Sequence, residues 1–280
     1  MLKVDNLSKD LDNFSLKNIS FTLEEGFIMG LIGPNGAGKS TLIKMILNLL
    51  KSDKGTIDIF GTNYKENEIF IKDNIGFVLD DFYFYEDLKV KDYKKIMKGF
   101  YSNFDNNLFD NYLLKFKINK NKRIRTLSKG EKMKVMLSGA LSHKAKLLIF
   151  DEATAGLDYI SRKELFKIFK EIIEEGDKSI IFSTHITSDL EGLADYITFI
   201  NNGEIVFSKD IENIKETYGL VRGDKETLEN MDVEFIGKKE NKYYSEGLFI
   251  KDEKNKVEGN ILAPSLDELM YYFIKGEEEC

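Results

Sequence analysis

The amino-acid sequence predicts an α/β fold with an antiparallel β edge, a helical insertion and a small C-terminal α+β appendage. Three observations lead to this prediction. Near the amino terminus, an apolar run is followed by a glycine-rich loop and an amphipathic helical pattern. Short apolar runs alternate with helical patterns again after residue 147, as in a sheet covered by helices. Beyond residue 210 this rhythm stops, and a weaker alternation with several glycines begins.

The first 50 residues supply the beginning of the core. Residues 15–23 alternate apolar and polar side chains, which indicates a strand with one exposed face. Residues 27–32 are apolar or glycine throughout, which is typical of a strand covered on both faces. After the loop at residues 33–38, residues 39–50 place leucine and isoleucine at helical spacing, so we expect a helix there.

The middle of the chain has a different character from the parts on either side. Residues 87–144 are rich in Lys, Leu, Phe and Tyr with few strand alternations, so we expect a helical segment. After it we expect strands over 147–150, 179–183 and 197–200, and helices over 161–175 and 188–194. Asn202-Gly203 is a hairpin-turn pair that leads into a further strand over 204–207.

The last part of the chain is expected to form a unit of its own. Residues 232–250 alternate weakly, whereas residues 265–275 form an amphipathic helical pattern. Ser265 precedes Glu268 by three residues, which is the spacing of a helix capping box. We therefore predict one domain over residues 1–210 and a small accessory domain over residues 211–280.

Composition limits the classes of protein to which the chain can belong. It has 48 acidic against 41 basic residues, and an acidic chain gives no support for a nucleic-acid partner, because neutralising phosphates requires clustered lysine and arginine. Cys280 is the single cysteine, so no internal disulfide can form, which fits a reducing cytosol. No apolar run approaches the roughly 20 residues that a membrane-spanning helix needs.

The glycine-rich loop carries the most specific motif. Its residues are Gly33-Pro34-Asn35-Gly36-Ala37-Gly38-Lys39-Ser40, followed by Thr41, and they fit the P-loop pattern G-x-x-x-x-G-K-[ST]. Glycines let several backbone N–H groups point at one anion, and the following helix adds the positive end of its dipole. Lys39 is expected to contact the β- and γ-phosphates of ATP, and the Ser40 hydroxyl to hold Mg²⁺. The expected fold is therefore a P-loop NTPase core.

A second candidate site follows the apolar strand at residues 147–150. Asp151 and Glu152 come directly after it, at the strand end that faces the ligand crevice in open α/β sheets. We expect Asp151 to hold Mg²⁺, directly or through water, and Glu152 to act as the general base on the attacking water. Alone, such a pair more often marks a strand end that meets solvent.

The segment between these two motifs narrows the family. Leu127-Ser128-Lys129-Gly130-Glu131 resembles the LSGGQ signature of ABC ATPases, and residues 151–158 resemble the run that follows in that family. His185, after the strand over 179–183, lies where the family has its switch histidine. The resemblance covers residues 1–210. Within the family, residues 27–41 and 127–134 are most similar to the ATP-binding subunits of bacterial bacitracin- and acetoin-type exporters.

This resemblance implies a function and partners. Two ATPase subunits, as a homodimer or a heterodimer, would enclose ATP between one P-loop and the other subunit's Ser128 and Gly130. His185 would contact the γ-phosphate, and Asp158 would cross the interface. An integral membrane permease subunit would convert closing and opening of the dimer into transport. The chain would then be peripheral to the cytoplasmic face of a bacterial plasma membrane.

The sequence departs from the family pattern at several positions. Asp80 stands where the family has a glutamine; it can still hold Mg²⁺ or water, but with a different charge and reach. Lys129 replaces a glycine of the signature, and its side chain either points to solvent or adds a cation near the partner's γ-phosphate. Phe14 is the nearest candidate to stack on adenine, the alternative being a core side chain. The aromatic run at residues 82–85 is expected to be a surface patch for the membrane subunit.

Other classes of protein explain fewer of these motifs. A soluble ABC-type ATPase that is not coupled to transport is the main alternative, but such proteins usually carry two ATPase halves, long coiled coils or zinc-binding cysteines. A P-loop kinase or GTPase leaves the signature segment and His185 unexplained. A non-catalytic subunit would account for Asp80 and Lys129, but not for an intact Lys39 and Glu152.

Overall fold

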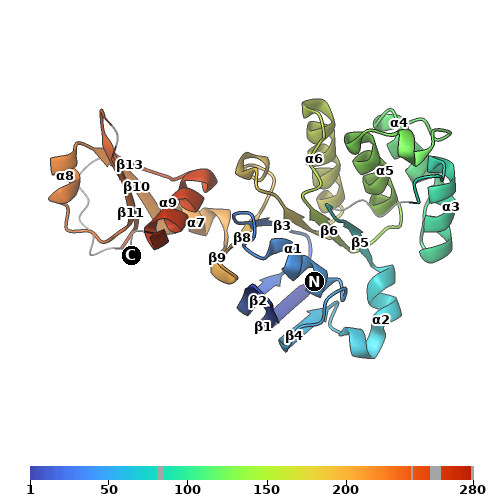
Figure 1. Ribbon diagram of the computed structural model, residues 1–280, viewed down its shortest axis with the longest axis horizontal. Coiled ribbons are helices and arrows are strands. Elements are labelled where there is room, and N and C mark those ends of the chain that lie inside the picture. Colours follow the sequence, from blue (N-terminus) through green and yellow to red (C-terminus); the bar gives the residue numbers. More distant parts are fainter. Residues whose placement is uncertain (81–84, 241, 253–259, 279–280) are drawn as a thin grey trace.

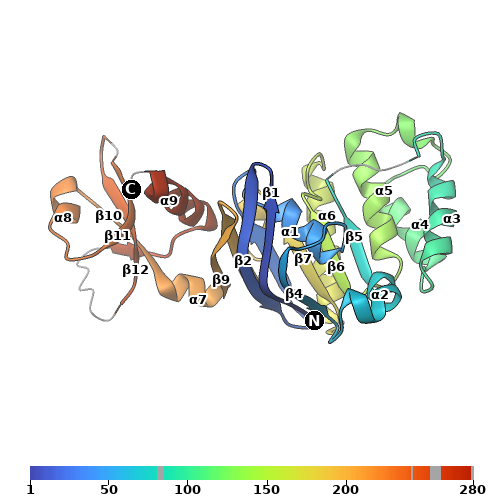
Figure 2. The same ribbon diagram turned by 60° about the horizontal axis from the view of Figure 1, so that its bottom comes forward.

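The computed structural model describes residues 1–80, 85–240, 242–252 and 260–278. These residues form three β-sheets with helices around them. The C-terminal sheet lies at one end of the molecule and the helical insertion at the other (Figures 1 and 2). No helix in these ranges is both long enough and apolar enough to span a membrane.

A six-stranded sheet forms the centre of the fold. Its strand order is β5-β6-β7-β3-β8-β9, and all neighbours are parallel except β8 and β9. The bounds of the strands are β3 Ile28–Ile32, β5 Ile75–Val78, β6 Leu147–Asp151, β7 Ser179–Ser183, β8 Tyr196–Asn201 and β9 Glu204–Asp210. Asn202 and Gly203 both have positive φ, 46° and 79°, as the expected hairpin turn requires.

A three-stranded antiparallel sheet covers one side of this centre and is the predicted β edge. Its order is β2-β1-β4, and its strands are β1 Leu2–Leu11, β2 Phe14–Leu23 and β4 Lys54–Ile59. β1 and β2 form a hairpin whose connection lies beside the P-loop helix α1, Lys39–Ile46 (Figure 2). This arrangement brings Phe14 close to the glycine-rich loop.

Alternation of side chains along the central strands explains why they are continuously apolar. On β3, Met29 and Leu31 pack with the antiparallel sheet and α1, whereas Ile28 and Ile32 pack with the helices on the other face. Successive side chains of a strand point to opposite faces, so a strand covered on both faces must be apolar at every position. This confirms the expectation for residues 28–32, whereas Phe27 precedes the strand and is 37% exposed.

Helices cover the other face of the central sheet and form the insertion. The insertion contains α3, α4, a 3₁₀ turn and α5 within the range predicted to be helical. The bounds are α2 Tyr64–Asp73, α3 Val90–Phe100, α4 Asn106–Lys115, the 3₁₀ turn Ile124–Thr126, α5 Lys129–Leu141 and α6 Tyr159–Glu174.

Two of the predicted helices were wrong in extent or type. The helix expected over residues 39–50 ends at Ile46, because Asn48 adopts a left-handed φ of 55° and the next two amides both donate to the Lys44 carbonyl. The helix expected over residues 188–194 is absent. A 3₁₀ turn, Thr187–Asp189, is followed there by turns, and Gly192 has a φ of 77°.

Among the described C-terminal residues, four antiparallel strands form a sheet of order β11-β12-β10-β13, and three segments are helical. The bounds are α7 Ile211–Thr217, β10 Tyr218–Gly223, α8 Lys225–Glu229, β11 Phe235–Glu240, β12 Ser245–Ile250, β13 Asn260–Leu262 and α9 Leu266–Glu278. The predicted capping box is confirmed, since Glu268 N–H donates to Ser265 Oγ and Ser265 N–H donates to Glu268 Oε2. Unlike a detached tail, α9 shares one hydrophobic cluster with the central sheet.

Candidate active site

A cavity of about 720 Å³ opens at the carboxyl ends of the central strands. The β1–β2 hairpin, the P-loop with α1, the loops after β5, β6 and β7, and the start of α5 all contribute to its lining. The lining residues are Leu11, Asn13, Phe14, Asn35, Gly36, Gly38, Lys39, Ser40, Thr41, Asp80, Lys129, Glu152, Ala155 and His185. The strand ends therefore bring motifs that are far apart in the sequence to one place.

The P-loop residues divide into two groups. Asn35, Gly36 and Gly38 to Thr41 line the cavity, whereas Gly33, Pro34 and Ala37 lie behind them and shape the loop. Gly38 has a φ of 111° and immediately precedes α1, so its backbone takes a conformation that residues with a Cβ rarely adopt. The first amides of α1 thus face the cavity, which is a suitable position to bind phosphate.

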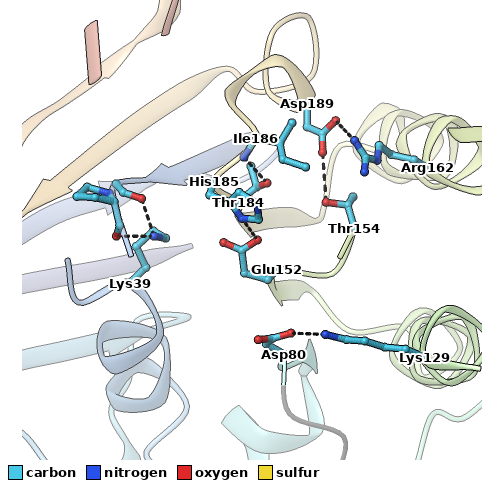
Figure 3. A network of polar contacts seen from close by, with 12 residues as sticks. Lys39, Asp80, Lys129, Glu152, Thr154, Arg162, Thr184, His185, Ile186 and Asp189 are labelled. Carbon is cyan, nitrogen blue, oxygen red and sulfur yellow. Dashed lines mark hydrogen bonds and ion pairs between the residues drawn. The ribbon is translucent and has the colours of Figure 1, made fainter. Parts of the chain in front are cut away.

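Lys39 is buried at the base of the loop. Its Nζ donates hydrogen bonds to the carbonyl oxygens of Gly33 at 2.6 Å and Pro34 at 3.0 Å (Figure 3). Burial lowers the pKa of Lys39, and the charges of Glu152 and Asp151 oppose that shift. The ammonium group is therefore held inside the loop with its charge balanced by the carboxylates across the cavity.

Asp151 and Ser40 provide the oxygen atoms that a magnesium site needs. Asp151 is buried at the end of β6, and its Oδ1 has no hydrogen-bond partner among the described residues. An unpartnered buried carboxylate oxygen is costly unless a cation or a water reaches it. No cluster of three or more His, Cys, Asp or Glu side chains suited to a metal occurs in the described ranges. A small number of protein ligands is consistent with Mg²⁺. This ion usually takes one or two carboxylates from the protein and its remaining ligands from water and substrate phosphates.

Glu152 is directed into the cavity by an unusual backbone conformation. Its φ is 52°, in the left-handed region that non-glycine residues seldom occupy. Such strain is found at functional sites more often than elsewhere. Burial raises the pKa of Glu152, while the hydrogen bond and charge of His185 act in the opposite direction. The carboxylate is therefore a stronger base than an exposed glutamate.

His185 lies beside Glu152, as the sequence predicts. The Glu152 carboxylate accepts a hydrogen bond of 2.7 Å from His185 Nδ1 (Figure 3). About half of the His185 side chain remains exposed to the cavity. The pair can orient a water molecule between the carboxylate and a phosphate in the loop, a geometry that suits general base catalysis.

The two main departures from the family pattern contact each other. Lys129 Nζ lies 3.6 Å from Asp80 Oδ1, and both side chains line the cavity (Figure 3). Neither side chain of this pair is deeply buried, so the ion pair contributes little to stability. Asp80 is thus directed at Lys129 from the loop after β5. Its role as a metal ligand stays a prediction.

The signature segment opens a helix, as the resemblance implies. Ser128 caps α5, because Glu131 N–H donates to Ser128 Oγ at 3.1 Å and Ser128 N–H donates to Glu131 Oε2 at 2.9 Å. A Cβ added to Gly130 would lie 2.4 Å from the carbonyl oxygen of Gly156. The backbone at Gly130 therefore packs against the loop after β6 in a way that a side chain would prevent.

Asp158 is held by its own chain. It caps α6 by accepting hydrogen bonds from the Ser161 amide at 2.9 Å and the Ser161 hydroxyl at 2.8 Å. Lys134 Nζ lies 3.1 Å from the same carboxylate. The pKa of Asp158 is held well below its usual range, mainly by the hydrogen bond from the Ser161 amide. The hydrogen bonds from the Ser161 hydroxyl and Lys134 lower the pKa further. The predicted contact across a dimer interface remains untested.

Phe14 lies where a base could bind. Its ring lines the cavity and packs over Gly38, where an added Cβ would lie 2.8 Å from the ring. It also packs against the apolar cluster under the antiparallel sheet. Phe14 is thus both a cavity-lining side chain and a partly buried side chain of the core. Stacking of adenine on Phe14 stays a prediction.

Sequence reasoning missed a buried polar network beside His185. Thr154 Oγ1 donates to Asp189 Oδ2 at 3.2 Å, and Arg162 Nη1 donates to Asp189 Oδ1 at 3.4 Å (Figure 3). Asp189 is buried, and in the sequence it falls in the segment that we expected to form a helix over residues 188–194. No local pattern indicates a contact across three separate segments, so only the fold reveals it.

Comparison with known proteins gives a consistent result. Residues 16–155 match the ABC transporter family. The chain is 30% identical over 219 residues to the ABC transporter ATP-binding protein YtrB of Bacillus subtilis, covering 78% of this chain and 75% of YtrB. It is 31% identical over 204 residues to the bacitracin transport ATP-binding protein BcrA of Bacillus licheniformis, covering 72% and 67% of the two chains. A solved ATP-binding subunit of an ABC transporter superimposes with a TM-score of 0.71 at 26% identity, covering 77% and 92%.

Proposed function

Since the chain belongs to the ABC transporter family and is an ATP-binding, ATP-hydrolysing subunit of a transport system, we propose that Glu152 and His185 catalyse that hydrolysis. The observation that carries this proposal is the hydrogen bond between them, across one cavity from Lys39. The P-loop fold predicted from the sequence and the similarity to bacitracin-type ATPases are both confirmed.

The residues have distinct roles in this mechanism. Backbone N–H groups of the P-loop and the Lys39 ammonium bind the β- and γ-phosphates, since they are the buried positive groups of the cavity. The Glu152 carboxylate accepts a proton from the attacking water at its oxygen. His185 holds that carboxylate through Nδ1 and presents the rest of its ring to the γ-phosphate.

Magnesium fits the remaining oxygen atoms. The unpartnered Oδ1 of Asp151 and the Ser40 hydroxyl would hold Mg²⁺, which would neutralise charge that develops on the phosphates. Asp80 is a further candidate, provided that it leaves Lys129.

The second subunit completes the site in this proposal. Ser128 and Gly130 begin α5, so the positive end of that helix is available to a γ-phosphate bound by another copy. We propose that two copies of this chain pair in this way, with a heterodimer as the alternative outcome. Residues 1–210 would form the ATPase domain, with its helical subdomain over about residues 87–144, and residues 211–280 the accessory domain.

Nucleotide binding can be tested with a single fluorophore. The chain has no tryptophan, so Phe14→Trp places one reporter at the cavity. We expect ATP to change its emission saturably, because an adenine ring stacks on the indole. The same variant should release phosphate from ATP in the presence of Mg²⁺, and this release should stop when EDTA removes the metal.

A matched control separates adenine contact from a general change of fluorescence. Tyr243→Trp places the reporter on an exposed site of the C-terminal sheet region, where ATP should leave the emission unchanged. An unchanged Phe14→Trp signal with intact hydrolysis would move adenine away from Phe14. Absence of ATP binding in wild-type protein would refute the proposed function.

An apolar groove supports a membrane partner. A cavity of about 560 Å³ lies between α2, β5 and α3. Ile69 and Phe100 line it and are 84% and 80% exposed, which is unusual for large apolar side chains. We propose that a cytoplasmic helix of the membrane subunit binds here, at the peripheral position on the cytoplasmic face that transport requires. Of the aromatic run predicted to serve this purpose, residues 82–84 lie outside the described residues.

Charged substitutions in the groove test this partner. Ile69→Glu and Phe100→Glu should each reduce co-purification with the cognate membrane subunit by about tenfold, because a charge is placed in an apolar contact. Leu114→Glu is the matched control, since Leu114 is 75% exposed on α4 outside the groove. ATP binding should stay unchanged in all three. Equal co-purification of the groove and control variants would exclude this surface.

A further inference from the structure

The last helix connects the C-terminal sheet to the ATPase core. On one side, α9 packs against β11, where Tyr272 lies within 3.2 Å of the Cβ position of Gly237. On the other side, the Phe273 ring lies 5.9 Å from Phe199 and 6.0 Å from Phe207 of the central sheet. Both ribbon views place α9 between the two parts (Figures 1 and 2). A displacement of the C-terminal sheet would therefore be transmitted to the core through α9.

The start of α9 contacts the segment that carries the catalytic histidine. The hydroxyl of Thr187 donates a hydrogen bond to Asp267, in the first turn of α9. Thr187 is 1% exposed and follows His185 by two residues. Packing between α9 and the Thr187–Asp189 turn accompanies the hydrogen bond. The segment that carries His185 is thus in direct contact with the C-terminal unit, as we call the proposed accessory domain of residues 211–280.

Other anchors of this segment come from the ATPase core. The Thr184 amide donates to the Leu31 carbonyl at 3.3 Å, and the Ile186 amide donates to Thr184 Oγ1 at 3.0 Å. Asp189 is held by Thr154 and Arg162. His185 stands between these anchors with its ring in the cavity. Its position therefore depends on where the backbone at residues 184–189 is fixed.

The start of α9, which carries Asp267, is fixed by charged groups of the C-terminal unit. Its neighbour Glu268 completes the capping box of α9 and accepts a hydrogen bond of 2.9 Å from Arg222 of β10. Arg222 also donates to the buried Glu246 of β12 at 2.9 Å. The start of α9 is thus tied to two strands of the C-terminal sheet, so that sheet determines where Asp267 lies.

We propose that Thr187 and Asp267 are positioning residues for His185, through which the C-terminal unit controls ATP hydrolysis. This inference rests on the role proposed for His185. Contact of ATP with His185 also fixes the residues that follow it, so the start of α9 is held more firmly when ATP is bound. Because binding effects are reciprocal, the Thr187–Asp267 contact then adds a small gain in ATP affinity, which is far smaller than its effect on turnover. The C-terminal unit is therefore both a regulator of the site and a reporter of its nucleotide state.

Removal of either partner should affect turnover and spare binding. Thr187→Val and Asp267→Ala are each expected to lower kcat about tenfold with KM nearly unchanged, because a displaced catalytic group costs up to about a hundredfold. Thr187→Ser keeps the hydroxyl donor, and Asp267→Asn keeps an oxygen acceptor. Each of these variants should therefore retain a kcat close to that of the unsubstituted protein. The double variant Thr187→Val/Asp267→Ala should be no slower than either single variant, because the two residues act through one contact.

The possible results separate this inference from the proposed function. His185→Ala is measured in parallel. If it lowers kcat and the Thr187 and Asp267 variants do not, the positioning role is refuted and the catalytic role stands. If His185→Ala hydrolyses ATP normally, the proposed function of His185 fails first. Additive losses that follow the melting temperature would assign Thr187 and Asp267 to stability alone.

A measurement on unsubstituted contacts makes the test independent of folding defects. Hydrogen exchange of Glu152→Gln, a variant in which ATP persists, is followed with and without Mg-ATP. We expect slower exchange at the amides of residues 187–190 and also of residues 266–270 when ATP is bound. Protection confined to the P-loop and residues 187–190 would overturn the proposal.

Discussion

Glu152→Gln is expected to lower the rate of ATP hydrolysis by about a thousandfold while ATP still binds, since a positioned general base contributes about 10²- to 10⁴-fold. The amide keeps the shape of the side chain and its contact with His185, but it cannot take a proton from water. Burial makes the native carboxylate a stronger base than an ordinary glutamate, so the loss should be large. Steady-state phosphate release measures it, with Glu171→Gln on the exposed side of α6 as the control.

The same variant tests the dimer. ATP that is not hydrolysed should hold two copies together, so size exclusion with light scattering should show a dimer only with Mg-ATP. A variant that binds ATP and stays monomeric would indicate a different partner subunit. Retention of near-normal hydrolysis would remove Glu152 from the role of base.

Lys39→Met is expected to weaken ATP binding by about a hundredfold, because it removes a buried charged donor worth about 1.5–3 kcal/mol from the phosphates. Hydrolysis should fall below detection. Methionine retains the length and the apolar stem of lysine, but it loses the hydrogen bonds of Lys39 Nζ to the Gly33 and Pro34 carbonyls, so part of the loss comes from the loop itself. Titration of ATP in a Phe14→Trp background measures the affinity of both forms.

The control for this substitution lies on the same helix. Lys44→Met changes the same residue type one turn or so later, at an exposed position of α1. It should bind ATP as the parent protein does. Equal affinity in the Lys39 and Lys44 variants would place the phosphates elsewhere than in the loop.

Local patterns were sufficient to predict the central strands and the P-loop. The strand at residues 28–32 is apolar because both of its faces are covered, and the spacing of the glycines identifies the loop without knowledge of its neighbours. The helix capped by Ser265 was predicted for the same reason, since its signal lies within one turn. Such features are encoded by adjacent residues.

Contacts between distant segments could not be predicted. Residues 188–194 have helical spacing, but Asp189 bonds to Thr154 and Arg162 and the segment turns instead. Asp80 and Lys129 are two separate departures in the sequence, and only the fold shows that they pair. These contacts could not be predicted because the residues that make them are far apart in the sequence, not because local structural preferences are weak.

The shared hydrophobic cluster has a consequence for synthesis of the chain. The aromatic side chains of Phe199 and Phe207 at the edge of the central sheet are covered by Phe273 of α9. A ribosome makes this helix after the strands that carry Phe199 and Phe207, while the earlier part of the chain already folds. Every nascent chain therefore passes through a stage in which the ATPase domain carries an uncovered aromatic edge. A chain that stalls before residue 266 keeps that edge exposed and is a natural client for chaperones.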